Sequence, residues 1–182
     1  VRYRLAPEAR HPAMLEDALA AVGTVRGRAD ELNVRPDAIG VMGSSAGGHL
    51  AAHCLVGWPE YDARVSLRPD FGVLCYPVIT STGPQAHVGS MDILGKTPTA
   101  ALLQAVSPEK QVREETPPCF LWHGGDDAAV TADNSMLFAQ ALRQHGVPFE
   151  LHIYGEGVHG LGLRTPCDWA GECVRWIGQT VG

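Results

Sequence analysis

The chain has 182 residues, an apolar fraction of 45% and a net charge of −6, as an ordinary globular domain does. The acidic balance and the lack of a basic run argue against a nucleic-acid partner, and no apolar segment is long enough to span a bilayer. Five cysteines, an odd number without paired spacing, favour buried thiols in a reducing, cytoplasmic compartment. The chain opens on Val1 as if inside a domain, so its first residues do not inform on a signal peptide.

Hydrophobic periodicity predicts an alternation of strands and helices. Val1–Leu5 alternates as a strand does, and apolar residues at helical spacing predict a helix from Pro12 to about Leu32. Ile39–Met42 is apolar throughout, which is typical of a central strand in a parallel sheet. Later strands are predicted at Phe71–Tyr76, Cys119–His123 and Phe149–Tyr154, and later helices at Thr99–Val106, Asn134–His145 and Asp168–Val181. This alternation predicts an α/β fold with a doubly wound, mostly parallel sheet and helices on both faces.

We expect one domain over residues 1–182, interrupted by an irregular segment at 80–117. That segment is rich in Pro, Gly, Ser and Thr. A long irregular insertion in an α/β domain is either a lid over the substrate or a plain surface excursion, and the sequence leaves both open.

Residues 43–47 match G-x-S-x-G, the nucleophile elbow, between a predicted strand and a predicted helix. A turn this tight leaves no room for a Cβ, so we expect Gly43 and Gly47 to be sterically required. Ser45 would then lie exposed at the carboxyl end of the sheet and at a helix N-terminus, which favours developing negative charge. A plain βα turn is the alternative. A phosphate loop is disfavoured because neither Gly-Lys-Ser/Thr nor G-x-G-x-x-G is present.

Asp127 and His159 also follow predicted strands directly, so they fall at the same edge of the sheet as Ser45. The order serine, acid, histidine suits acyl transfer: His159 takes the proton of Ser45, and a carboxylate orients the imidazole. Asp126 is the competing acid. Asp127 is favoured because it precedes the inward-packing Val130 by three residues, whereas Asp126 is better placed to bond the loop backbone.

His49 and His53 are four residues apart and share a helix face, as metal-binding pairs do. The glutamate of H-E-x-x-H is missing and no third ligand is evident, so we expect no metal and no cofactor. A histidine that lines the pocket or packs at its rim is the favoured interpretation.

Several segments resemble the α/β-hydrolase superfamily, and in particular its acetyl-xylan esterase and feruloyl esterase-like members. They are YRLAPE at residues 3–8, SAGGHLAA at 45–52, PPCFLWHGGDDAAV at 117–130 and ELHIYGEGVHGLGL at 150–163. The related hormone-sensitive-lipase-like esterases usually carry aspartate where this chain has Ser44. The resemblance implies a serine carboxylic ester hydrolase for short-chain, acetyl-type esters, including those of carbohydrates. It assigns Ser45, Asp127 and His159 as the triad and the Ala46 N–H as an oxyanion donor.

The chain departs from this family at its beginning. The family's first three strands, and the glycine-rich oxyanion loop after the third, lie upstream of the Y-R-L segment. The resemblance therefore implies a partial, N-terminally truncated hydrolase domain with a gap between Val1–Leu5 and the elbow strand. Losing one oxyanion donor costs roughly 10²–10³ in rate. A prolyl-oligopeptidase-type serine peptidase and a non-catalytic binding protein on the same fold are the alternatives.

Overall fold

The computed structural model describes residues 1–87, 94–164 and 166–182. Four parallel strands form one sheet in the order β1-β2-β3-β4. Their bounds are β1 Gly40–Ser44, β2 Phe71–Cys75, β3 Cys119–Gly124 and β4 Phe149–Tyr154. Ser44 pairs with Cys75, and Cys75 pairs with Trp122. The carboxyl ends of β1, β2 and β3 therefore lie close together, and the loops that follow them meet at one edge.

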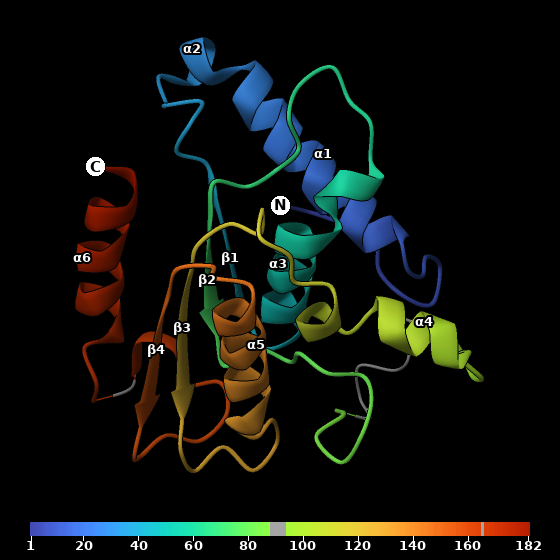
Figure 1. Ribbon diagram of the computed structural model, residues 1–182, viewed down its shortest axis with the longest axis vertical. Coiled ribbons are helices and arrows are strands. Elements are labelled where there is room, and N and C mark those ends of the chain that lie inside the picture. The colour runs from blue at the N-terminus through green and yellow to red at the C-terminus, as the bar shows by residue number, and fades with distance from the viewer. Residues whose placement is uncertain (88–93, 165) are drawn as a thin grey trace.

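Helices cover both faces of this sheet (Figure 1). Their bounds are α1 Ala13–Gly27, α2 Ala29–Leu32, α3 Ala46–Gly57, α4 Ala100–Ala105, α5 Asp133–Gln144 and α6 Trp169–Val181. Helices α3 and α5 pack on one face, α1 packs outside α3, and α6 covers the other face. The predicted α/β class is confirmed.

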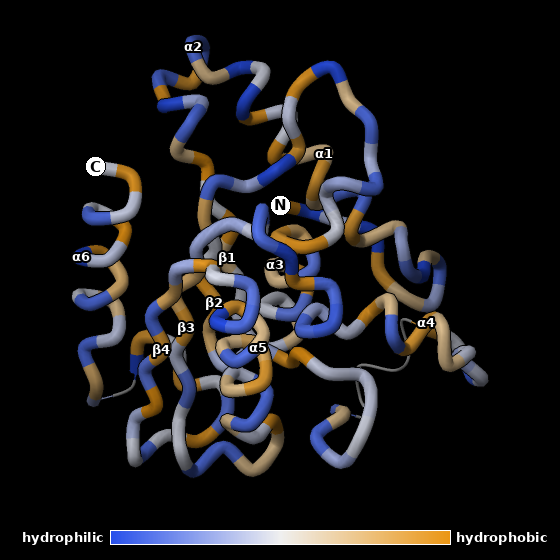
Figure 2. Tube along the Cα trace, viewed as in Figure 1, coloured by the Kyte–Doolittle hydropathy of each residue, from blue (hydrophilic) through white to orange (hydrophobic). Residues whose placement is uncertain are grey.

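The alternation of side chains along the strands creates two apolar layers. Leu74 and Leu121 point toward α3 and α5, whereas Phe120 and Trp122 point toward α6, where Trp176 meets them. The apolar colour in Figure 2 lies largely along the strands and the helices beside them. A sheet that is covered on both faces needs apolar residues at successive positions, which is why β2 and β3 read as continuous apolar runs.

Two predictions about the start of the sheet are wrong. Val1–Leu5 is not a strand, and β1 lies at an edge of the described sheet rather than in its centre. A strand exists only where its backbone pairs with a neighbour, and among the described residues β1 pairs with β2 alone. The exposure of Met42, 61%, follows from this edge position.

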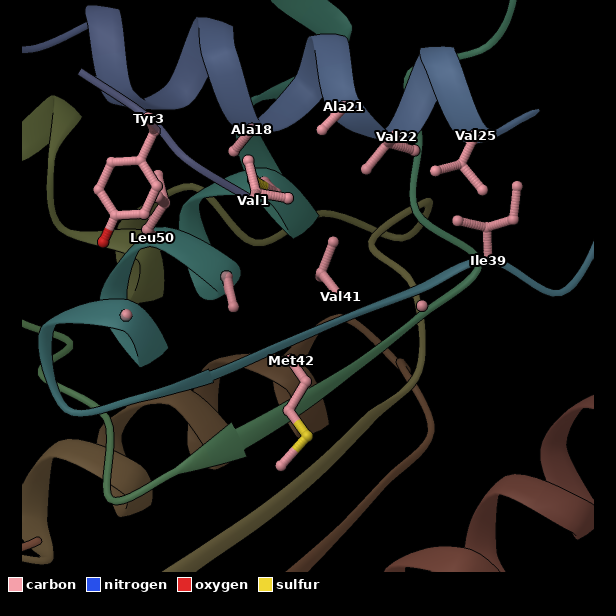
Figure 3. A pocket seen from close by; sticks show the side chains of 14 residues that line it. Val1, Tyr3, Ala18, Ala21, Val22, Val25, Ile39, Val41, Met42 and Leu50 are labelled. Carbon is pink, nitrogen blue, oxygen red and sulfur yellow. The ribbon is translucent and has the colours of Figure 1, made fainter. Parts of the chain in front are cut away.

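An apolar groove lies between α1 and the free edge of β1, and we call it the edge groove (Figure 3). Ala21, Val22 and Val25 of α1 point into it from above, and Val41 of β1 points up between them, whereas Met42 points away. Its volume is about 290 Å³. Val1 and Tyr3 of the opening segment also line this groove, and the segment does not pair with the sheet.

The remaining elements follow the predictions closely. The expected helix to Leu32 is divided at Arg28, just after Gly27, into α1 and α2. The Thr99 and Asp168 side chains cap α4 and α6 by accepting hydrogen bonds from backbone N–H groups three residues on. Helix α4 lies within the expected insertion at 80–117, of which residues 88–93 are outside the described part. No helix in the described part of the chain is long and apolar enough to cross a bilayer.

Candidate active site

Ser45 occupies a strained turn between β1 and α3. Its φ and ψ are 55° and −119°, a region that side-chain-bearing residues rarely adopt. Backbone hydrogen bonds hold it there: the Ser45 N–H donates to the Cys75 carbonyl at 3.0 Å, and the Val78 N–H donates to the Ser45 carbonyl at 3.2 Å. The turn is therefore fixed by the segment that leaves β2, which is the physical requirement for presenting the hydroxyl at the sheet edge.

The steric role of the glycines differs in part from the prediction. A Cβ on Gly43 would overlap the carbonyl group of Gly47, so the expectation for Gly43 holds. A Cβ on Gly47 would meet nothing within 4 Å, because Gly47 faces the edge groove, so that expectation is wrong. The second tight position is Gly48, where a Cβ would lie 2.8 Å from the Cβ of Pro77.

Ser45, His159 and Asp127 form one chain of hydrogen bonds. The Ser45 Oγ is 2.7 Å from the His159 Nε2, and the His159 Nδ1 is 2.6 Å from the Asp127 Oδ2. A carboxylate can only accept, so the Nδ1 carries the proton and the Nε2 is left to accept from the serine hydroxyl. This is the tautomer in which an imidazole can remove the proton of a nucleophile.

Asp127, and not Asp126, is the carboxylate that contacts His159. Its side chain is buried, and its Oδ1 accepts from the N–H groups of Ala129 at 3.0 Å and Val130 at 2.9 Å. Asp126 is exposed to solvent. The two backbone donors fix the rotation of the carboxylate, so that its other oxygen faces the imidazole.

A second histidine, His123, lies behind Asp127, and the sequence had offered no partner for it. Its Nε2 is 2.8 Å from the Val130 carbonyl and its Nδ1 is 2.8 Å from the Ser135 Oγ. Because a carbonyl only accepts, the Nε2 carries the proton and the Nδ1 accepts from the serine hydroxyl. Burial lowers the pKa of His123, so it stays neutral and holds the loop that carries Asp127.

Tyr76 is the second residue that sequence reasoning missed. Its ring meets the His159 ring edge-on, with centroids 5.2 Å apart, and also contacts the Trp122 ring at a centroid distance of 5.0 Å. It has a φ of 37°, directly after β2. The position itself, a residue at the carboxyl end of a strand and followed by Pro77, was the only available signal. The Tyr76 ring packs against the imidazole and so limits the rotation of His159.

A cavity of about 230 Å³ opens in front of Ser45, and we call it the front pocket. Its apolar lining comes from Leu5, Ala6, Met14, Leu15, Ala46, Leu50 and Val78, and its polar lining from Tyr3, Ser45, His11, His49, His53 and His87. Among the described residues, no Asp, Glu, Lys or Arg side chain is in that lining. The prediction that a helix histidine lines the pocket is confirmed for both His49 and His53.

One backbone N–H group lies next to Ser45 at the start of α3. Ala46 is the first residue of α3, so its N–H belongs to the helix turn that lacks intrahelical acceptors. An oxyanion that forms at Ser45 would meet that N–H and the positive end of the helix dipole. Across the described residues, no group of three or more His, Cys, Asp or Glu side chains is arranged to hold a metal ion.

Comparison with known proteins agrees with this architecture. A profile described as the alpha/beta hydrolase fold matches residues 1–163. The chain belongs to the α/β-hydrolase fold family. The crystal structure of an acetyl ester-xyloside bifunctional hydrolase from Caldicellulosiruptor lactoaceticus superimposes on this α/β-hydrolase chain with a TM-score of 0.89 at 45% identity, covering 98% of this chain and 69% of that one.

Two curated relatives are considerably longer than this chain. The chain is 42% identical over 159 residues to endo-1,4-beta-xylanase B of Butyrivibrio fibrisolvens, which covers 83% of this chain and 25% of that protein. It is 33% identical over 184 residues to an acetylxylan esterase of Xylanibacter ruminicola, covering 98% of this chain and 37% of that protein. The chain thus spans about a quarter to two fifths of these relatives.

Proposed function

We propose that this α/β-hydrolase chain carries the active site of a serine carboxylic ester hydrolase that acts on short-chain, acetyl-type esters, including those of carbohydrates. The observation that carries the proposal is the hydrogen-bonded chain from Ser45 through His159 to Asp127, with distances of 2.7 and 2.6 Å. The strained elbow at the N-terminus of α3 also supports the proposal. Ser45, His159 and Asp127 are the proposed catalytic residues, and Ala46 the proposed oxyanion donor.

In the first half of the reaction, the Ser45 Oγ attacks the carbonyl carbon of the ester while its proton passes to the His159 Nε2. The carbonyl oxygen becomes an oxyanion and receives the Ala46 N–H. Asp127 stabilises the imidazolium through the Nδ1–H and stays ionised itself. When the C–O bond to the alcohol breaks, the alcohol leaves with the proton from the Nε2, and the acyl group remains on Ser45.

In the second half, a water molecule takes the place of the alcohol. His159 removes a proton from the water, whose oxygen attacks the acyl carbonyl, and the second tetrahedral intermediate collapses to the free acid. The proton returns from the Nε2 to the Ser45 Oγ. Both halves use the same three side chains, because the imidazole alternates between base and acid.

The substrate class rests on the relatives. One is named an acetylxylan esterase, and one solved structure is described as an acetyl ester-xyloside bifunctional hydrolase. The front pocket fits this class because its described lining has no charged side chain, which suits a neutral ester.

The test is turnover of 4-nitrophenyl acetate by the chain and by Ser45→Ala, together with active-site titration by a fluorophosphonate. We expect stoichiometric labelling of the unaltered chain and turnover that the substitution abolishes. Labelling without turnover would mean that the nucleophile is competent and the oxyanion site is too weak. Neither labelling nor turnover in a chain that circular dichroism shows to be folded would refute the proposal for this chain.

The same assay separates the two alternatives. A prolyl-oligopeptidase-type peptidase would hydrolyse a proline anilide faster than the aryl acetate. A binding protein on this fold would leave Ser45 unlabelled.

A further inference from the structure

Three histidines form one wall of the front pocket, and we call His11, His49 and His53 the histidine wall. The rings of His11 and His53 are stacked, with centroids 5.2 Å apart and planes 9° apart. His49 meets His53 edge-on at 5.6 Å. Two of the three come from consecutive turns of α3 and the third precedes α1, so the wall exists only because α1 packs on α3.

The wall is polar but uncharged near neutral pH. Burial lowers the pKa of His49 to about 4 and that of His53 to about 3, where the neighbouring histidines add to the effect. Burial also lowers the pKa of His11, against the opposing influence of Glu60 and Glu16. A neutral imidazole offers one N–H donor and one nitrogen acceptor.

Much of this hydrogen-bonding capacity is unused. Within the described part of the chain, neither ring nitrogen of His49 has a hydrogen-bond partner, although the residue is only 6% exposed. The nearby backbone of Val78 opposes the fall in its pKa but lacks the geometry of a hydrogen bond. The Nε2 of His53 donates to the Ala105 carbonyl at 3.2 Å, which leaves its Nδ1 as an acceptor. An unpartnered buried donor or acceptor is costly, so a hydroxyl that enters the front pocket and pairs with these groups would be stabilised there.

The chemistry of the wall matches a hydroxyl group, which is itself both donor and acceptor. An acetyl group carries an acceptor, its carbonyl oxygen, but no donor, so it would leave the acceptor nitrogens of the wall unpaired. The alcohol half of a carbohydrate ester carries hydroxyls beside the acylated oxygen. The apolar lining from Met14, Leu15 and Leu50 supplies a surface for the C–H groups of a ring.

We propose that the histidine wall is the subsite that recognises the hydroxyl-bearing alcohol half of the ester, with His11 and His49 as specificity-determining residues. This inference rests on the proposed function, because it assigns the front pocket to the substrate of Ser45. The ligand class is a neutral, ring-shaped polyol ester with a free hydroxyl next to the ester oxygen.

The experiment compares two esters that differ by one hydroxyl, trans-2-acetoxycyclohexanol and cyclohexyl acetate. We expect the chain to prefer the hydroxylated ester by about 10-fold or more in kcat/KM, the range of one well-placed hydrogen bond to a substrate hydroxyl. His11→Phe keeps a ring that can stack on His53 but removes both nitrogens, and it should bring the ratio of the two kcat/KM values close to one. His49→Phe should also lower the ratio of the two kcat/KM values.

The matched control is His145→Phe, the same substitution on an exposed histidine after α5, and it should leave the ratio unchanged. Absence of a preference in the unaltered chain, or a preference that survives both pocket substitutions, would overturn the inference while ester hydrolysis stands. A preference for phenyl hydroxyacetate over phenyl acetate that His11→Phe abolishes would also overturn it, because the hydroxyl would then be read on the acyl side.

A binding measurement separates the wall from the chemistry. In Ser45→Ala, trans-cyclohexane-1,2-diol should shift the ¹⁵N ring signals of His11 and His49 more than cyclohexanol does. If the unaltered chain hydrolyses neither ester and is not labelled at Ser45, the proposed function fails. Equal ¹⁵N shifts from the two alcohols would overturn the assignment of the histidine wall as a hydroxyl subsite, whatever the outcome for the proposed function.

Discussion

Replacing Asp127 by asparagine tests the geometry of the candidate site most directly. The Oδ1 accepts from the N–H groups of Ala129 and Val130, and only an oxygen can do so. The oxygen of the introduced amide must therefore take that place, which turns its NH₂ group toward His159. An NH₂ group donates to the Nδ1, so the imidazole must carry its proton on the Nε2. In that tautomer the Nε2 cannot accept the proton of Ser45.

The expected loss in kcat for aryl acetate hydrolysis is about 10⁴-fold, which corresponds to about 5 kcal/mol of transition-state stabilisation. The substitution keeps the shape of the side chain and both backbone hydrogen bonds, so the thermal midpoint should change little. Stopped-flow measurement of the acylation burst gives the loss in the step where His159 acts as base.

Asp126→Asn is the matched control, since it makes the same chemical change on the adjacent exposed residue. It should keep kcat within about twofold, as surface substitutions usually do. The reasoning would be refuted if Asp127→Asn kept a tenth of the activity, or if Asp126→Asn lost as much as Asp127→Asn.

Three further predictions follow from the fold around the site. Gly43→Ala should lower the thermal midpoint and abolish fluorophosphonate labelling, because the added Cβ would overlap the Gly47 carbonyl. Gly47→Ala should change neither the midpoint nor the labelling, and equal behaviour of the two variants would contradict the prediction. Burial lowers the pKa of His49 to about 4 and that of His53 to about 3, so the unfolded chain binds more protons than the folded chain below pH 6.5. The free energy of unfolding should therefore fall by about 2 kcal/mol per histidine between pH 7.5 and 5. Urea titrations of the unaltered chain and of His49→Gln measure this loss, and an equal loss in the variant would contradict the prediction. In the described sheet the outer edge of β1 is unpaired and Met42 is 61% exposed, so the chain should self-associate in sedimentation velocity. Met42→Lys should weaken this self-association, and identical sedimentation profiles at all concentrations would contradict the prediction.

The local patterns were enough to predict the fold class and the region of the site. Short apolar or alternating runs predicted the β2, β3 and β4 segments, and a helical period predicted α5 and α6; all of them fall close to where they were predicted. The G-x-S-x-G turn needs little beyond its own sequence, since the overlap at Gly43 arises within five residues. Parallel strands place their carboxyl ends at one edge, which brought Ser45, Asp127 and His159 together in the prediction.

Contacts between elements that are distant in sequence decided the rest. The sequence shows that Ile39–Met42 is apolar, but it does not show which strands pair with this segment. In the structure β1 lies at an edge of the described sheet. Asp127 rather than Asp126 contacts His159 because the loop backbone turns two N–H groups onto the Asp127 carboxylate. The packing of Tyr76 on His159 and the stacking of His11 on His53 join segments whose separation no local pattern spans. The sequence alone therefore determined the serine, acid and histidine of the candidate site, and the tertiary structure decided which neighbouring residues orient these side chains and line the pocket beside them.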